Sequence, residues 1–359
     1  DLRDPALSGP GVPARALALH RDLTPAFEAW ARERVASGRA ADAPLHDVPT
    51  TEWPMFTAVF YLMATQELET AARRGELPAE QAPLRYSAGA VEAARALIVD
   101  PVHHTWVRTH WGQDYLHRED VFFRSLLIAG LTSHEALTHD ARSIAMLRDQ
   151  VESLSADLDR SELGLLHDYP GECYPIDVLA AIGFIRRADA VLGTDHSAFV
   201  ERSARAFDGD RLDRAGLPRY RVLLPSGAEV QPSRGIGNSW ILLFAPDLWP
   251  ERSRGWYARY EDHFWRDRGW AAGFREFLPG TEPDWTFEID AGPVLDGLGT
   301  SANAFAIAAA RRNGRFDHAY TLSSEMIATS WPLPDGTLLG PRAVSHAADA
   351  PYLGEAAIL

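Results

Sequence analysis

Apolar residues recur every three or four positions along most of this 359-residue chain, with polar residues between them. This spacing is typical of amphipathic helices that bury one face. Alternating patterns typical of strands are few, and no Gly/Ser-rich linker divides the chain. The pattern predicts helices over residues 16–37, 55–72, 87–99, 118–137, 141–158, 175–192, 197–207, 238–244, 251–266, 294–312 and 316–329.

The predicted helices pair across short connections, as in folds built from helical hairpins. We therefore predict an all-α fold, an (α/α)6 toroid or barrel of helical hairpins with long loops at one mouth. A single barrel domain would span residues 1–359, with residues 1–14 as an irregular lead-in. Residues 208–237 are rich in Gly, Pro and Arg, and we expect a loop excursion there with a hairpin at 225–227.

The segment from Leu165 to Asp177 gathers acidic, imidazole, tyrosine and thiol groups directly before a predicted helix. Pro170 and Gly171 favour a turn, and Pro175 suits the first helical turn, where a missing N–H costs nothing. A carboxylate such as Asp177 is favoured near a helix N-terminus. Reactive groups on a stiff loop at the start of a helix indicate the rim of an active site. The alternative is an acidic helix cap with a tyrosine-rich surface turn.

In a closed ring of hairpins, loops from one end would meet at one mouth. Loops that combine a carboxylate or an arginine with an aromatic residue, a glycine or a proline are 51–53, 111–115, 172–177, 234–238, 275–276 and 288–293. Burial raises the pKa of some carboxyl groups in such a pocket, and pairing with Arg keeps others ionised, which suits general acid–base catalysis. The predicted catalytic residues are Glu172, Asp177, Asp290 and Cys173, and the predicted substrate-binding residues are Glu52, Trp53, Trp111, Asp114, Tyr174, Arg275 and Glu288.

Two of these catalytic assignments have a plain structural alternative. Alternation places Glu288 and Asp290 on one side of an extended segment, where Asp290 is either functional or an anchor for the next helix. Cys173 is a nucleophile only if a base or a helix terminus lowers its pKa, and is otherwise a packed thiol. The histidines within 103–117 lack metal-ligand spacing such as HExxH, so we expect no metal there.

The net charge of the chain limits the classes of partner that it can bind. The formal net charge of -15 argues against a nucleic acid or an anionic membrane surface as the main partner. We expect a small-molecule substrate. All 35 cationic residues are arginines, and the absence of lysine excludes a lysine Schiff base and a Walker-type phosphate loop. The chain begins at Asp1 without a methionine. We expect a trimmed N-terminus, as in an exported or membrane-anchored bacterial protein, with the compartment open.

Three segments resemble the linalool dehydratase-isomerase family, a bacterial (α/α)6-barrel group. Residues 172–177, Glu-Cys-Tyr-Pro-Ile-Asp, are similar to the family's Cys-Glu-Pro-Asp-Asn loop, with Cys173 on the first cysteine. Residues 119–124, Glu-Asp-Val-Phe-Phe-Arg, resemble the Glu-Asn-aromatic start of the family's histidine-bearing helix. Residues 275–310 resemble its closing acidic loop and Gly/Ala-rich helix. The similarity runs loosely from about residue 50 to about residue 330.

The chain also departs from the family pattern. Ile182 stands at the position of the second cysteine, and Leu126 lies near the position of the histidine. The resemblance implies cofactor-free acid–base chemistry on an alcohol, by water loss or allylic isomerisation, between protomers of a ring-shaped homo-oligomer. Glu172, Asp177 or Asp290 would then take over the proton transfers.

The aromatic residues fit more than one chemistry. In a lyase or isomerase acting on a terpenoid alcohol, the ring faces of Tyr174 and Trp53 would stabilise an allyl cation. The same inventory suits a glycoside hydrolase acting on a sugar, with Asp177 and Asp290, or Glu52, as its carboxylate pair. A third hypothesis is a module that binds a sugar or a lipid without turnover.

Overall fold

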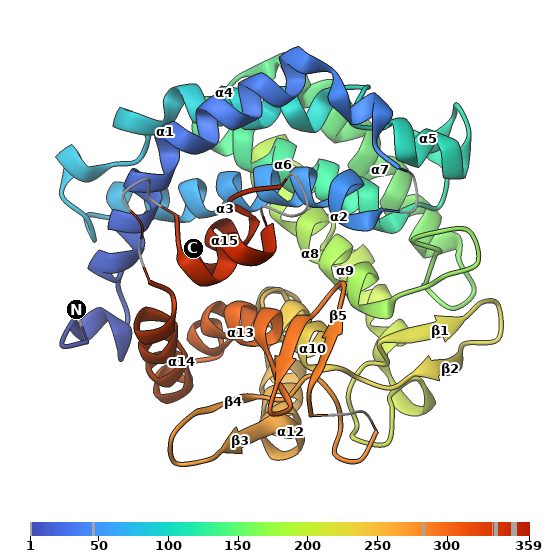
Figure 1. The fold of residues 1–359 in the computed structure, drawn as a ribbon. Coiled ribbons are helices and arrows are strands. Elements are labelled where there is room, and N and C mark those ends of the chain that lie inside the picture. Colours follow the sequence, from blue (N-terminus) through green and yellow to red (C-terminus); the bar gives the residue numbers. More distant parts are fainter. Residues whose placement is uncertain (1, 45–46, 282–283, 332, 334–336, 346–349) are drawn as a thin grey trace. The chain divides into compact units, whose positions relative to one another are not determined.

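The computed structural model describes residues 2–44, 47–281, 284–331, 333, 337–345 and 350–359. Most of these residues lie in helices, and short antiparallel pairings form the sheets (Figure 1). The predicted mainly helical class is therefore confirmed, with small sheets in addition. The chain divides into two compact units. Unit 1 comprises residues 1–109, 129–147 and 324–359, and unit 2 comprises residues 110–128 and 148–323.

The described secondary-structure elements of unit 1 are all helices. Its helices are α1 (Ala14–Ser37), α2 (Val48–Thr51), α3 (Trp53–Arg73), α4 (Leu84–Val99), α15 (Leu339–Ser345) and α16 (Leu353–Ile358). Helix α4 lies beside both α1 and α3 (Figure 1). Their interior buries Phe27 and Tyr61, whose rings stack 4.0 Å apart. A hydrogen bond of 2.8 Å between His20 Nε2 and the Thr65 hydroxyl joins α1 to α3 inside this core.

Four α-helices contribute residues to both units, namely α5 (Thr105–Trp111), α6 (Val121–Thr138), α7 (Ile144–Arg160) and α14 (Phe316–Thr329). Short 3-10 helices span Pro5–Leu7, Arg39–Asp42, Ala79–Gln81, Tyr115–His117, Ala141–Ser143, Ala204–Phe207 and Gly209–Arg211. None of the helices in the described part of the chain has the length and apolar character needed to cross a membrane.

Unit 2 carries all of the described strands. Its helices are α8 (Pro175–Leu192), α9 (Ser197–Ser203), α10 (Gly235–Ile241), α11 (Ala245–Leu248), α12 (Pro250–Phe264) and α13 (Thr300–Arg312). Strands β1 (Arg221–Leu223) and β2 (Ala228–Gln231) pair antiparallel, as do β3 (Trp265–Asp267) and β4 (Ala272–Phe274). A third antiparallel sheet has the order β5 (Thr286–Glu288), β6 (Gly292–Leu295) and β7 (Leu298–Gly299).

Helix α10 is central to unit 2 because it packs against both α8 and α13 (Figure 1). Phe184 of α8 meets the ring of Phe244 edge-on at 4.7 Å, and Trp240 meets Phe244 at 5.0 Å. Gly183 permits this approach, since a Cβ there would lie 2.8 Å from the Cβ of Phe244. These contacts fix the middle of α8 against α10 and the residues that follow it, and the candidate site lies at the N-terminal end of α8.

Two local predictions differ from the structure. The helix predicted over 294–312 begins only at Thr300, because Asp296 and Gly297 have φ angles of 50° and 80° and form the turn between β6 and β7. Residues 105–111, 339–345 and 353–358, which lie outside the predicted helices, are helical. The hairpin predicted at 225–227 is present as β1 and β2.

Candidate active site

The segment that precedes α8 is a tight turn fixed by backbone hydrogen bonds. The N–H of Asp168 donates to the carbonyl of Glu172 at 2.9 Å, and Gly171 takes the positive φ of 86° that the turn requires. The N–H of Val222 in β1 donates to the carbonyl of Cys173 at 3.0 Å. Because Pro175 then begins α8 without needing an N–H partner, Asp177 lies in the first helical turn.

Asp177 is the central acid of the site. The indole N–H of Trp240 donates a hydrogen bond to its carboxyl group. Burial, and then the nearby charge of Asp290, raise the pKa of Asp177 to about 7, whereas the bond from Trp240 acts in the opposite direction. Asp177 can therefore be protonated or ionised near neutral pH, which general acid–base catalysis requires.

Two tyrosines connect Asp290 to the turn before α8. The buried hydroxyl of Tyr220 donates to Asp290 Oδ2 at 2.9 Å. The ring of Tyr174 meets the ring of Tyr220 edge-on, with 5.5 Å between centroids, and its hydroxyl donates to Glu172 Oε2 at 2.7 Å. Arg221 also pairs with Glu172, at 3.3 Å. The predicted site residues Glu172, Tyr174 and Asp290 are therefore linked through the ring pair of Tyr174 and Tyr220.

A buried ion pair between Arg234 and Glu276 lies beside the ring of Tyr220. Arg234 Nε donates to Glu276 Oε1 at 2.8 Å, and its guanidinium lies 4.6 Å from the centre of the Tyr220 ring. Arg234 also pairs with Glu288 at 3.0 Å. Burial raises the pKa of Glu276 to about 7 despite the opposing effect of Arg234. This group of charges fixes Tyr220, and through it the position of Asp290.

Cys173 lies in the turn before α8, within the site, but its thiol is not activated for nucleophilic attack. Its side chain is fully buried. Burial is the main cause that raises the pKa of this thiol, and the carboxyl groups of Asp168 and Asp177 raise it further. Since a nucleophilic cysteine needs a lowered pKa, the geometry favours the packed-thiol alternative.

The remaining predicted site residues are distributed over both units. Glu52 is buried immediately before α3, and Trp53 is the first residue of that helix, so both belong to unit 1. Trp111 is half-buried at the end of α5, and Asp114 is exposed and pairs with His117 at 3.3 Å.

Arg275 belongs to the site through its backbone. Its N–H donates to the carbonyl of Phe264 at 2.8 Å. Its own carbonyl packs so closely against Gly235 that a Cβ there would lie 2.0 Å away. Glycine at position 235 therefore lets α10 begin against Arg275, the residue that follows β4.

Several groups in the site were not singled out from the sequence. Asp168 lies in the segment that attracted attention, and Arg234 and Glu276 lie in loops expected at the mouth, so composition gave a signal for these three. Tyr220 lies in the expected loop excursion, and Trp240 fits a helical core pattern. No sequence signal distinguishes these two residues from ordinary packing.

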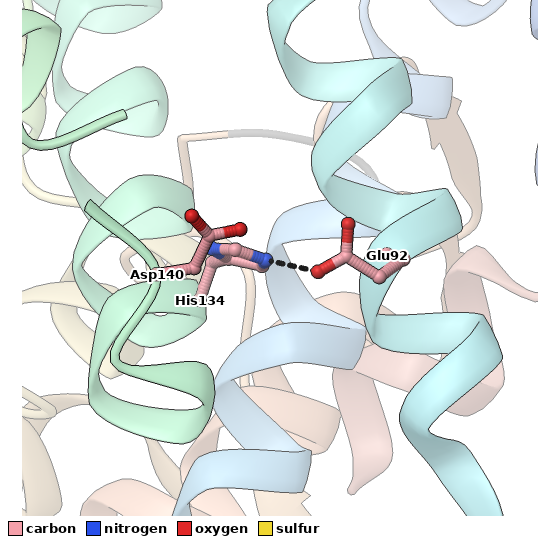
Figure 2. A group of neighbouring side chains, drawn as sticks. All are labelled: Glu92, His134 and Asp140. Atoms are coloured by element: carbon pink, nitrogen blue, oxygen red, sulfur yellow. Dashed lines mark hydrogen bonds and ion pairs between the residues drawn. The ribbon is translucent and has the colours of Figure 1, made fainter. Parts of the chain in front are cut away.

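A second cluster of ionisable groups lies in unit 1. Glu92, His134 and Asp140 each offer a ligand atom within 4.8 Å of the others, and Figure 2 shows their side chains converging from α4, α6 and the segment after α6. His134 Nε2 lies 2.9 Å from Glu92 Oε1. Arg142 pairs with Glu92 at 2.7 Å and also with Asp140, so a guanidinium already supplies the positive charge. We interpret this cluster as an ion-pair network that links α4 to the end of α6.

Comparison of the chain with protein-family models and with curated proteins finds no match. The resemblance to the linalool dehydratase-isomerase family thus depends on the three segments given above.

Proposed function

We propose that unit 2 carries a cofactor-independent acid–base site that removes water from an alcohol, or isomerises it, through a cation-like transition state. One observation carries this proposal. Asp177 and Asp290, far apart in the chain, interact electrostatically beside the rings of Tyr174 and Tyr220. The resemblance to the linalool dehydratase-isomerase family supports the same chemistry and a terpenoid alcohol as substrate.

The proposed reaction uses two carboxyl groups in different roles. Protonated Asp177 gives its proton to the substrate hydroxyl, and the C–O bond breaks to release water and leave a carbocation. Asp290, oriented by the Tyr220 hydroxyl, accepts a proton from the adjacent carbon, and the C–H electron pair becomes the new double bond. The tyrosine ring faces stabilise the intermediate cation. Isomerisation would instead return water to another carbon of the allyl cation.

The test uses linalool as the alcohol and gas chromatography to follow hydrocarbon formation. Asp177→Asn and Asp290→Asn should each lower kcat by about 10²–10⁴-fold, the range typical of a lost general acid or base. Asp262→Asn, which changes an exposed carboxylate on α12, is the matched control and should keep parental activity. Retained turnover in both site variants would remove the acid–base assignment.

Exposed tryptophans in unit 2 favour a second candidate, a glycoside hydrolase. Trp270 and Trp285 have exposed fractions of 77% and 68%, and Trp285 directly precedes the strand that leads to Asp290. Flat exposed indoles suit stacking on sugar rings. Hydrolysis of oligosaccharides by the parent and not by Asp177→Asn, followed by NMR at the anomeric carbon, would favour this candidate over the lyase.

The proposal also covers the arrangement of the helices and the oligomeric state of the chain. We propose that the helical pairs close into an (α/α)6 barrel and that the chain forms a homo-oligomer, as the family resemblance implies. Multi-angle light scattering tests the assembly, and an experimental structure tests the barrel. A monomer in solution would argue against a pocket shared between protomers.

A further inference from the structure

The sheet formed by β5, β6 and β7 in unit 2 has one covered face and one exposed apolar face (Figure 1). Val294 of β6 is buried on the covered face, and Glu288 of β5 lies on the same side and forms an ion pair at 3.0 Å within unit 2. Successive side chains of a strand point to opposite faces, so Trp285, Phe287 and Ile289 share the other face.

The register of β5 and β6 adds Leu295 to the exposed face. Phe287 lies opposite Pro293, and the same register sets Leu295 opposite Trp285. The exposed fractions of Trp285, Phe287, Ile289 and Leu295 are 68%, 60%, 43% and 48%. Because a buried aromatic side chain covers about 150–250 Å², these four residues expose roughly 400 Å² of apolar surface. We call them the β5 face, and exposed apolar patches of this size often mark interaction sites.

Strand β5 is also the open edge of its sheet. At the other edge, a bridge between Leu298 and Arg275 joins β7 to the residue after β4. Among the described residues, no strand or bridge pairs with the outer edge of β5. Since Pro293 has no N–H, its pairing with Phe287 is the type without hydrogen bonds, and the N–H and C=O of Phe287 point toward the open edge. Another strand can therefore pair there.

The sequence around β5 is complementary to a second copy of itself. In an antiparallel pairing centred on Phe287, the two Phe287 side chains meet, and Trp285 meets Ile289 of the second copy. On the other face, Thr286 lies opposite Glu288 of the second copy, so a hydroxyl faces a carboxylate. Cross-strand apolar pairs of this kind stabilise a sheet. A two-fold axis produces this arrangement, because such an interface uses the same patch on both chains.

The same register brings each copy close to the candidate site of the other. Beyond the ends of the paired strands, Asp284 lies opposite Asp290 of the second copy. Arg266 pairs with Asp284 at 3.5 Å, and Tyr220 donates to Asp290 at 2.9 Å, so both carboxylates have a partner in their own chain. Each copy would therefore contribute Asp284 to the surroundings of the other copy's Asp290.

We propose that the β5 face is the interface of a two-fold dimer, in which the two β5 strands pair antiparallel. A standard interface covers about 800 Å² on each partner, and somewhat more than half of that area is apolar. The β5 face supplies most of this apolar share. The inference rests on the homo-oligomer in the proposed function, whose contact surface it identifies, and not on the acid–base chemistry.

Light scattering and sedimentation velocity of the full chain test this interface. At physiological salt and micromolar concentration, the parent should have twice the chain mass of 39.6 kDa. Phe287→Glu places two carboxylates against each other at the two-fold axis and should reduce the mass to that of one chain. Phe287→Arg should have the same effect with two guanidinium groups. An equimolar mixture of the two variants should restore the dimer, because opposite charges then meet at the axis.

Leu223→Glu is the matched control, because Leu223 is an exposed apolar residue on β1, in a different sheet. This variant should keep the dimer mass. Circular dichroism of all variants should match that of the parent, since each change is at an exposed side chain.

Three results would overturn the proposal. The parent could be a monomer, as expected if a sugar or another protein occupies the β5 face. The mixture of Phe287→Glu and Phe287→Arg could stay monomeric. Finally, Phe287→Glu could leave the mass of the parent assembly unchanged, in which case the homo-oligomer of the proposed function would stand with a different interface. Since no turnover is measured, these results are separate from the test with linalool.

Discussion

Asp177 lies where a carboxylate normally gains stability from the N-terminus of a helix, yet burial and Asp290 raise its pKa to about 7. The position is the first turn of α8, as the sequence indicates, while the N-cap residue is Tyr174. The environment leaves the same carboxyl group able to hold a proton near neutral pH, and Trp240 of α10 donates a hydrogen bond to it.

The raised pKa of Asp177 makes the stability of the fold depend on pH. Because the folded protein binds this proton between about pH 4 and about pH 7 and the unfolded chain does not, the free energy of unfolding falls as the pH rises through this range. One such group contributes a slope on the order of 1.4 kcal/mol per pH unit. Urea unfolding at several pH values should show this slope reduced by that amount in Asp177→Asn.

The control for this measurement is Asp262→Asn, whose carboxylate is exposed on α12. Its stability should change with pH in parallel with the parent. Parallel curves for the parent and Asp177→Asn would mean that Asp177 is ionised in the folded protein throughout, and the acid role of Asp177 would lose its basis.

At the scale of elements, the start of α10 depends on the absence of a side chain at residue 235. The N–H of Gly235 donates to the carbonyl of Glu276 at 2.7 Å, and the carbonyl of Arg275 occupies the space of a Cβ. This contact holds the loop that carries Glu276 against Arg234. A methyl group at residue 235 would therefore separate the buried ion pair beneath Tyr220.

We predict that Gly235→Ala lowers the free energy of unfolding by about 2–4 kcal/mol, through overpacking and disturbance of the buried ion pair. Gly255→Ala is the matched control, because it lies within α12 and meets only the flexible end of Arg259, at 3.4 Å. Helix propensity should make that variant more stable by roughly 0.5–1 kcal/mol. Equal effects of the two substitutions in urea unfolding would contradict the packing argument.

Strand β5 shows how alternation positions charge. Glu288 on β5 pairs with Arg234, and Asp290, two residues on, accepts from Tyr220. Ile289, between them, has an exposed fraction of 43%. The alternation noted in the sequence thus places both acids toward partners within unit 2, although the helix expected immediately afterwards begins only after β7.

At the scale of the whole molecule, charge limits the partners. The chain has 50 acidic residues against 35 arginines, and many described arginines pair with carboxylates, such as Arg202 with Asp159 and Arg315 with Glu261. We predict no measurable binding to labelled duplex DNA by fluorescence anisotropy at physiological salt, where non-specific binders show Kd values of about 10⁻⁴–10⁻⁶ M. Salt-sensitive binding in that range would contradict the prediction.

The sequence by itself determined the helical class, most helix positions and the importance of the segment before α8, because periodicity and helix-start chemistry are local properties. It also identified Asp177 and Asp290 as acids of interest. Only the tertiary structure brought Tyr220 and Trp240 to these acids, buried Asp120 where no side chain of the described residues hydrogen-bonds to its carboxyl group, and paired Arg124 with Asp157. Burial and pairing between distant segments set the protonation of a carboxyl group, and neither is encoded in the spacing of neighbouring residues.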